Sequence, residues 1–318
     1  MKRLDDIVGH ADTLKRLRDA LDGGRLPHGL LFAGPVGVGK RTVADALAVD
    51  FLGGTADVAR RIEAGTHGDY HPVSRQLIRN HDSGGKSKAI DLSVKVIRPE
   101  LVEPANRASI EGKGKVFLVE EAETMTSAAQ NALLKTLEEP AGRAMIVLLT
   151  DRPESLLPTV RSRCQTFRFG ELSSGEMLRV LEEQGVDRRA AEAAYAVAGG
   201  SPGRGKQFLD EGVVDNFGEL ARRLDAAAPV AEFLTAAADA AAKAELERDP
   251  LGSKDAFTRN GYRLWLGLVG DHLRRRLRDD AEPSLCDRID AVARCDRYLS
   301  ANVNVGLALR QLDLALTA

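Results

Sequence analysis

A glycine-rich loop at residues 34–40, with the sequence GPVGVGK, is the feature that most constrains how this chain can fold. It follows a short apolar run at residues 29–33. It precedes residues 42–52, whose apolar side chains share one face of a helix. A buried strand, a glycine loop and a helix in this order form the context of a phosphate-binding loop. The order therefore predicts an α/β domain that binds a nucleotide.

The residues of this loop have separate roles in holding phosphate. Gly34, Gly37 and Gly39 let backbone N–H groups turn toward phosphate oxygens, and the helix that follows offers its positive N-terminus. Lys40 places a positive charge on the outer phosphates. We therefore expect ATP to bind here, whereas its hydrolysis depends on further residues.

The residue after Lys40 departs from the usual pattern. A Walker A loop carries Ser or Thr at this point, because the hydroxyl coordinates Mg²⁺. This chain has Arg41, which either contacts a phosphate or points into solvent. Thr42 lies about 100° further around the helix, so we expect its hydroxyl to point away from the ion. The loop alone therefore leaves Mg²⁺ binding open.

An acidic run follows a second apolar segment, residues 115–119, where a phosphate-loop enzyme carries an aspartate for the metal shell. Glu120 takes the place of that aspartate and is one methylene longer, while Glu121 is a candidate general base. The alternative is that the run only forms the solvated end of a strand. Together with Arg41, this second departure at one metal site predicts inefficient hydrolysis.

Apolar runs at residues 144–150 and 165–169 complete a set of strands separated by helical segments. Such alternation predicts a parallel sheet with helices on both faces. One of these helices is expected to begin at a capping box formed by Ser127 and Gln130. The predicted fold class is therefore α/β.

After residue 169 the chain shows helical periodicity only. A capping box at residues 173–176 opens a small helical module, and the remainder is rich in alanine and leucine at helical spacing. We therefore expect three domains. They are a nucleotide-binding domain at 1–169, a helical lid at 170–210, and an all-α oligomerisation bundle at 211–318.

Composition excludes several classes of protein. The 45 basic and 47 acidic residues leave a net charge of −2, so no strongly basic surface covers the chain. Its three cysteines are too few for a disulfide framework, which favours a cytoplasmic location. His67, Asp69, His71 and His81 match no standard zinc spacing, so we expect solvated loops around a short strand near residues 70–77, and no metal. No segment has the length and apolarity of a membrane helix.

Two stretches carry a resemblance to a known family. Residues 131–140, NALLKTLEEP, and residues 157–165, LPTVRSRCQ, closely resemble the AAA+ clamp-loader subunits of bacterial DNA polymerase III. The resemblance covers the first 210 residues well and the rest only by length and helical type. It implies a heteropentamer of loader subunits that opens the ring-shaped sliding clamp and places it on primer-template DNA. Because the chain has no basic stripe or stacking aromatics, most DNA contacts are expected from the assembled ring.

Several residue roles follow only from this resemblance. Arg163 occupies the arginine of the Ser-Arg-Cys motif, which in the family reaches across a subunit interface to the ATP of a neighbour. Thr150 matches the sensor 1 region and Arg204 the sensor 2 position, both of which face the nucleotide. The alternatives are an ordinary ion-pair arginine, a strand terminus and a helix-start arginine. Subunits of this family often carry a four-cysteine zinc module after the first helix. Residues 50–70 of this chain contain no cysteine, so we expect no zinc.

The departures at Arg41 and Glu120 favour one role within such a complex. They suit a structural subunit of the DNA polymerase III holoenzyme that serves a neighbour's active site through Arg163. Two alternatives are an ATP-hydrolysing motor subunit of the same loader and an unrelated phosphate-loop switch. The last of these leaves the helical C-terminal region unexplained.

Overall fold

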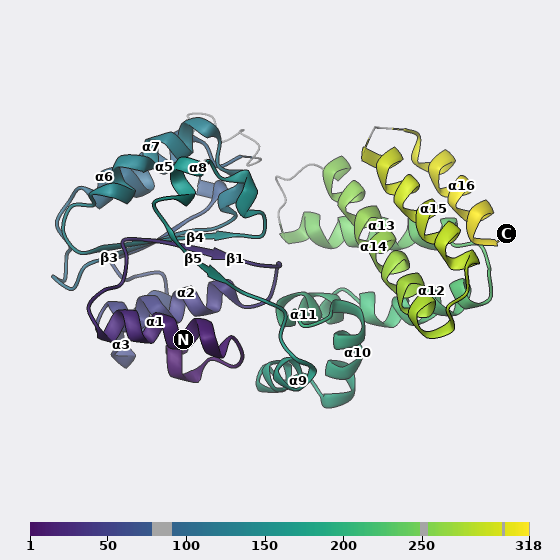
Figure 1. Cartoon of the computed structure of the whole chain (residues 1–318), viewed down its shortest axis with the longest axis horizontal. Helices are drawn as coiled ribbons and strands as arrows, with labels where there is room; N and C mark the ends of the chain where they lie inside the picture. Colours follow the sequence, from purple (N-terminus) through teal and green to yellow (C-terminus); the bar gives the residue numbers. More distant parts are fainter. Residues whose placement is uncertain (78–90, 249–253, 301–302, 318) are drawn as a thin grey trace. The chain divides into compact units, whose positions relative to one another are not determined.

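The computed structural model describes residues 1–77, 91–248, 254–300 and 303–317 (Figure 1). They belong to two compact units, Met1–Gly205 and Lys206–Ala318. A further boundary at residue 170, between a sheet domain and a lid, stays a prediction. The expected loop around His81 lies outside the described residues. None of the helices in the described stretches combines the length and the apolar character needed to span a bilayer.

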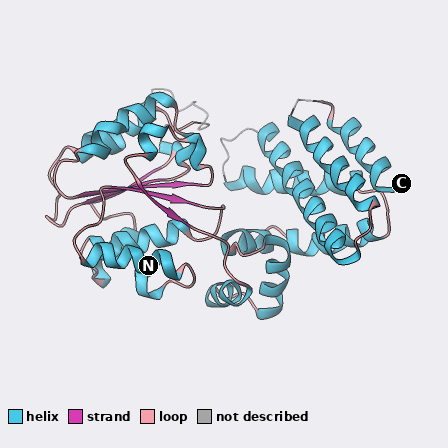
Figure 2. Cartoon of the chain, in the orientation of Figure 1, coloured by secondary structure: helices cyan, strands magenta, loops and turns pink. Residues whose placement is uncertain are grey.

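A parallel sheet of five strands forms the centre of the first unit, which confirms the predicted α/β class (Figure 2). In chain order the strands are β1 (Gly29–Ala33), β2 (Tyr70–Val73), β3 (Lys115–Val119), β4 (Ala144–Thr150) and β5 (Gln165–Arg168). Their spatial order is β2-β3-β4-β1-β5, and all neighbouring pairs are parallel. Every residue of β1, β3 and β4 is buried, as expected for a parallel sheet covered on both faces.

Helices cover both faces of the sheet (Figure 1). One face carries α1 (Ala11–Asp22), α2 (Lys40–Phe51) and α3 (Ala56–Glu63). The other carries α5 (Val94–Ile97), α6 (Glu103–Ala105), α7 (Ser127–Glu138) and α8 (Pro158–Arg161). Alternate residues of β4 enter separate cores, with Met145 and Val147 on the first face and Ile146 and Leu148 on the second. Each face of the sheet thus has its own apolar core.

Helix α7 begins one residue earlier than its expected capping box, so that prediction was wrong. Thr126 is the N-cap, and its hydroxyl accepts a hydrogen bond from Ala129 N at 3.2 Å. Gln130 is buried, where its amide donates to Met125 O at 3.1 Å and accepts from Leu157 N at 2.7 Å. Tertiary contacts of Gln130 therefore replace the reciprocal capping bond that the sequence suggested.

The described residues after β5 are mainly helical, as predicted. Helix α9 (Ser174–Glu183) begins at the expected capping box, in which Ser173 N donates to the Glu176 carboxylate at 2.8 Å. The helices that follow are α10 (Arg188–Ala198), α11 (Pro202–Asp210), α12 (Val213–Asp225), α13 (Ala231–Arg248), α14 (Lys254–Asp280), α15 (Ser284–Ser300) and α16 (Val305–Thr317). In the second unit, Trp265 of α14 meets Phe233 of α13 edge-on, with ring centroids 5.5 Å apart. The second unit is thus a packed helical domain.

We expect Thr126→Ala to lower the free energy of unfolding by about 1 kcal/mol, because it removes an acceptor for the first turn of α7. Ser127→Ala is the matched control. That side chain is exposed and is not the cap, so its change should stay within about 0.5 kcal/mol. Urea denaturation followed by circular dichroism measures both. Equal losses in the two variants would contradict the assignment of Thr126.

Candidate functional site

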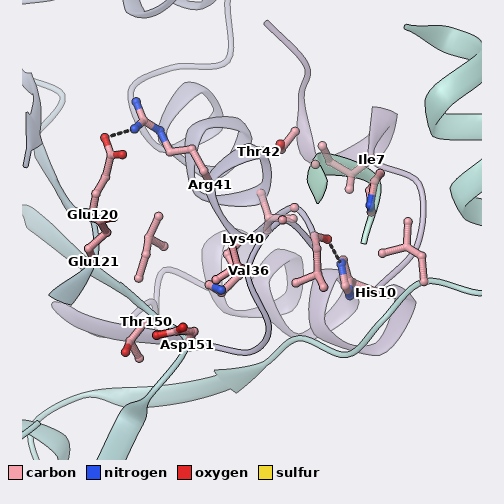
Figure 3. Close-up of a pocket in the computed structure, with 18 of the residues that line it drawn as sticks. Ile7, His10, Val36, Lys40, Arg41, Thr42, Glu120, Glu121, Thr150 and Asp151 are labelled. Carbon is pink, nitrogen blue, oxygen red and sulfur yellow. Dashed lines mark hydrogen bonds and ion pairs between the residues drawn. The ribbon is translucent and has the colours of Figure 1, made fainter. Parts of the chain in front are cut away.

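A cavity of about 690 Å³ lies in the first unit, at the carboxyl ends of β1, β3 and β4 (Figure 3). Ligands of open parallel sheets bind at this edge. Most of the predicted nucleotide-binding residues line it, namely Gly37, Gly39, Lys40, Arg41, Thr42, Glu120, Glu121 and Thr150. Gly34, Arg204 and Arg163 do not line it. The fold thus brings together the predicted residues from three separate parts of the chain.

The phosphate loop takes a shape that only glycine permits at three points. Gly37 and Gly39 have φ angles of +78° and +103°, in the left-handed region that favours glycine. A Cβ on Gly34 would lie 2.2 Å from the carbonyl oxygen of Phe169. Gly39 is also the N-cap of α2, so the loop leads directly into that helix. The positive end of α2 therefore lies at the cavity wall.

Lys40 is the first residue of α2 and is held over the loop. Its Nζ donates to Gly34 O at 2.5 Å and to Pro35 O at 2.8 Å. Burial lowers the pKa of Lys40, while the carboxylates of Asp151 and Glu123 oppose this shift. Both acceptors of the ammonium are neutral carbonyls, and a charged phosphate oxygen is a stronger acceptor. The side chain is therefore placed to exchange them for phosphate.

Arg41 joins α2 to the end of β3. Its Nε donates to both carboxylate oxygens of Asp45, each at 2.9 Å, and its Nη1 donates to Glu120 Oε1 (Figure 3). The Tyr70 hydroxyl donates to Asp45 as well. Burial disfavours the charge of Arg41, but Asp45, Tyr70 and Glu120 outweigh that effect and raise its pKa. One of the two alternatives for Arg41 was a guanidinium that points into solvent. The structure instead pairs it with Asp45 and Glu120.

Glu121 is held in a second ion pair. Its φ of +47° turns the chain out of β3, and its carboxylate accepts from Arg75 Nε at 2.6 Å. Both Glu120 and Glu121 thus have an arginine partner, and both side chains remain partly exposed. Figure 3 shows the Thr42 side chain directed away from Glu120. No hydroxyl on α2 stands beside these carboxylates.

Two carboxylates in the cavity were missed by sequence reasoning. Thr150 is buried at the end of β4, where its Oγ1 accepts from Arg152 N at 3.0 Å. Glu123 and Asp151 line the cavity with it. Burial raises the pKa of Glu123, and the Asp151 carboxylate adds to the shift. Their positions in the sequence could have identified them, because Glu123 and Asp151 each follow closely on a strand that ends at the cavity.

The helical region closes the cavity at the phosphate loop. Ser201 Oγ donates to Val36 O at 2.7 Å, and Gly203 N donates to Gly37 O at 2.9 Å. A Cβ on Gly37 would lie 2.7 Å from Arg204 N. These contacts place the start of α11, including Arg204, directly on the loop, although Arg204 is not part of the cavity lining.

Away from the loop the lining is mainly apolar. It includes Ile7, Val8, Leu172 and Val180, together with the polar side chains of Lys2 and Gln184. Beside it, His10 Nε2 lies 2.8 Å from Val38 O and its ring meets Phe169 edge-on at 4.9 Å (Figure 3). His10 was not predicted from the sequence, which shows no periodic signal in that segment. The cavity thus has a charged end at the loop and a mainly apolar end at the N-terminal segment.

No group of three or more His, Cys, Asp or Glu side chains in the described part of the chain is arranged to hold a metal ion. Asp69, one of the candidate ligands, instead accepts hydrogen bonds from Ile110 N at 2.7 Å and Glu111 N at 2.9 Å. His71 stacks on Phe117, with ring centroids 4.8 Å apart. The short strand is present as β2, but His67 and Asp69 are buried, so the solvated environment expected for them was wrong.

Arg163 lies at the amino ends of the strands, whereas the phosphate loop lies at their carboxyl ends. Its carbonyl oxygen would be 2.9 Å from a Cβ on Gly29, which begins β1, whereas the loop follows the end of β1. A strand of five residues spans about 13 Å. The Arg163 guanidinium pairs with Glu138 through Nε at 2.6 Å and donates from Nη1 to Thr159 O at 2.9 Å. The structure therefore keeps Arg163 away from this chain's own loop.

We expect Gly37→Ala to release the start of α11 from the loop, because the new methyl group would lie 2.6 Å from Ser201 Oγ and 2.7 Å from Arg204 N. Gly24→Ala is the control, since Gly24 also has a positive φ, +61°, but nothing lies within 4 Å of its Cβ. Both variants bear a backbone strain of about 1 kcal/mol. Only Gly37→Ala should speed hydrogen exchange at the amides of Ser201, Gly203 and Arg204. Equal exchange in both variants would argue against this docking.

Comparison with known proteins identifies the family. Residues 9–173, more than half of the chain, match the family model described as DNA polymerase III, delta subunit. DNA polymerase III subunit delta' of Pseudomonas aeruginosa is 33% identical over 232 residues, which are 66% of this chain and 67% of that protein. The replication factor C small subunit of Methanococcus vannielii is 31% identical over 183 residues, which are 57% and 50% of the two chains.

The coverage of these relatives is partial. The chain spans 50% to 56% of the length of several replication factor C small subunits that it matches. Among solved structures, a DNA polymerase III gamma subunit-related protein of Thermotoga maritima is 18% identical, with 95% of this chain and 98% of that chain covered and a TM-score of 0.46. On the family match and the Pseudomonas relative, the chain belongs to the DNA polymerase III, delta subunit family.

Proposed function

We propose that this chain is an AAA+ clamp-loader subunit of DNA replication. It acts with other loader subunits in a heteropentamer, and the complex opens the sliding clamp and places it on primer-template DNA. Family membership supports this role, because relatives along the matched residues carry the names DNA polymerase III subunit delta' and replication factor C small subunit. The sheet domain and the second, helical unit of this chain agree with this role.

The cavity is the proposed nucleotide site. Its volume of about 690 Å³ lies within the range of about 300–1,000 Å³ for small-molecule sites. The phosphates fit the charged end, beside Lys40 and the N-terminus of α2, and the base fits the apolar end near Ile7 and Leu172. The pairing of Glu120 with Arg41 and of Glu121 with Arg75 favours ATP that is held without turnover.

Arg163 is the proposed arginine finger for a neighbouring subunit. The observation that carries this role is its position, because it lies at the amino ends of the strands, away from its own phosphate loop, and so does not serve its own nucleotide. A guanidinium is permanently charged and suits the charge that develops on a transferred phosphoryl group. Glu138 holds the side chain in this structure, and the neighbour's phosphates are the competing partner.

We expect Arg163→Ala in a reconstituted loader to slow ATP hydrolysis at the site it serves by about a thousandfold, the lower range for loss of an arginine finger. Arg161→Ala is the matched control, because Arg161 is an exposed arginine two residues away. Phosphate release and clamp loading are measured on each complex, with assembly checked by mass. Unchanged hydrolysis and loading with Arg163→Ala would remove the trans role.

The purified chain should hydrolyse ATP no faster with Mg²⁺ than with EDTA, because the carboxylates of a hydrolytic site are already paired with arginines. Phosphate release over several hours, against a heat-denatured sample, is the measurement. Sustained Mg²⁺-dependent turnover by the isolated chain would support an ATP-hydrolysing motor subunit instead.

A further inference from the structure

A guanidinium stands where a phosphate-loop enzyme keeps its magnesium ligands. In such enzymes the residue after the loop lysine supplies a hydroxyl to the ion, and a carboxylate after a neighbouring strand completes the shell. Here the residue after Lys40 is Arg41, and its Nη1 donates to Glu120 Oε1 at the end of β3 (Figure 3). The positive charge beside Glu120 is therefore a side chain of the protein, where a phosphate-loop enzyme has a magnesium ion.

A carboxylate of the same helix holds Arg41 in this position. Asp45, one turn further along α2, accepts from Arg41 Nε through both oxygens at 2.9 Å, and only 13% of the Asp45 side chain is exposed. The Tyr70 hydroxyl donates to Asp45 and lies 3.4 Å from Arg41 Nη2. The Arg41 side chain is nevertheless 41% exposed and lines the cavity. It is therefore both fixed in place and accessible to a ligand.

The residues present do not fit Mg²⁺. This ion prefers an octahedral shell of oxygen ligands. The hydroxyl ligand is missing, Glu120 is bonded to Arg41, and Glu121 is bonded to Arg75. A divalent ion at this point would have to displace a guanidinium from each of these two carboxylates. The other carboxylates of the lining, Glu123 and Asp151, act on the ammonium of Lys40.

We infer that this pocket binds a nucleoside triphosphate free of Mg²⁺, with Arg41 as the built-in cation beside the outer phosphates. The inference rests on the proposed nucleotide site and specifies the form of its ligand. Lys40 and the N-terminus of α2 hold the phosphates, and Arg41 supplies the charge that the ion brings in other phosphate-loop proteins. Binding should therefore not depend on divalent ions.

The test is isothermal titration of the full chain with ATP, in excess MgCl₂ and in excess EDTA. We expect the two Kd values to agree within about threefold, less than the loss of one charge-assisted hydrogen bond. Arg41→Thr restores the hydroxyl and frees Glu120, so EDTA should weaken its binding by at least about tenfold. Arg60→Thr is the matched control, because it removes an exposed arginine that pairs with Asp57 on α3, outside the cavity lining.

Each outcome bears on the inference. Wild-type binding that needs Mg²⁺ overturns it and leaves the proposed nucleotide site and loader role standing. The absence of ATP binding in both buffers overturns it together with the nucleotide site, whereas the trans role of Arg163 is judged separately by Arg163→Ala. Equal wild-type Kd values support it even if Arg41→Thr fails to fold.

Discussion

Parallel pairing of β1 with β4 and β5 is the constraint on which the rest of this molecule depends. Since all five strands run in one direction, the segments after β1, β3 and β4 meet at one edge of the sheet and surround a single cavity. Arg163 precedes β5 and therefore lies at the opposite, amino ends of the strands. The same geometry thus separates the residues that face this chain's own ligand from the residue proposed to serve another chain.

Charge balance then decides what the cavity can hold. At an effective dielectric constant of about 20, two unit charges 4 Å apart interact by about 4 kcal/mol. Attraction of this kind holds Arg41 to Asp45 and Glu120, and a divalent ion would have to displace the guanidinium from Glu120. The pocket has the shape of a phosphate site, but its cation is a side chain.

Much of the fold could be predicted because its signals are local. The glycine loop, the apolar runs of β1, β3 and β4 and the capping box at Ser173 each depend on a few consecutive residues. Predictions failed where distant contacts intervene. Gln130 has the spacing of a capping box, but its side chain accepts a hydrogen bond from Leu157 N instead. Helices α5 and α6 were not predicted because they are too short to show a helical period.

The sequence by itself determined that a strand, a phosphate loop and a helix occur in succession, because three glycines, a lysine and flanking apolar runs admit few other structures. It also showed that Arg41 and Glu120 were unusual. Only the tertiary structure decided that these two residues meet, and that Arg75 pairs with Glu121. The physical reason is that an ion pair depends on the distance between charges, and residues 79 positions apart are brought to that distance by the pairing of strands.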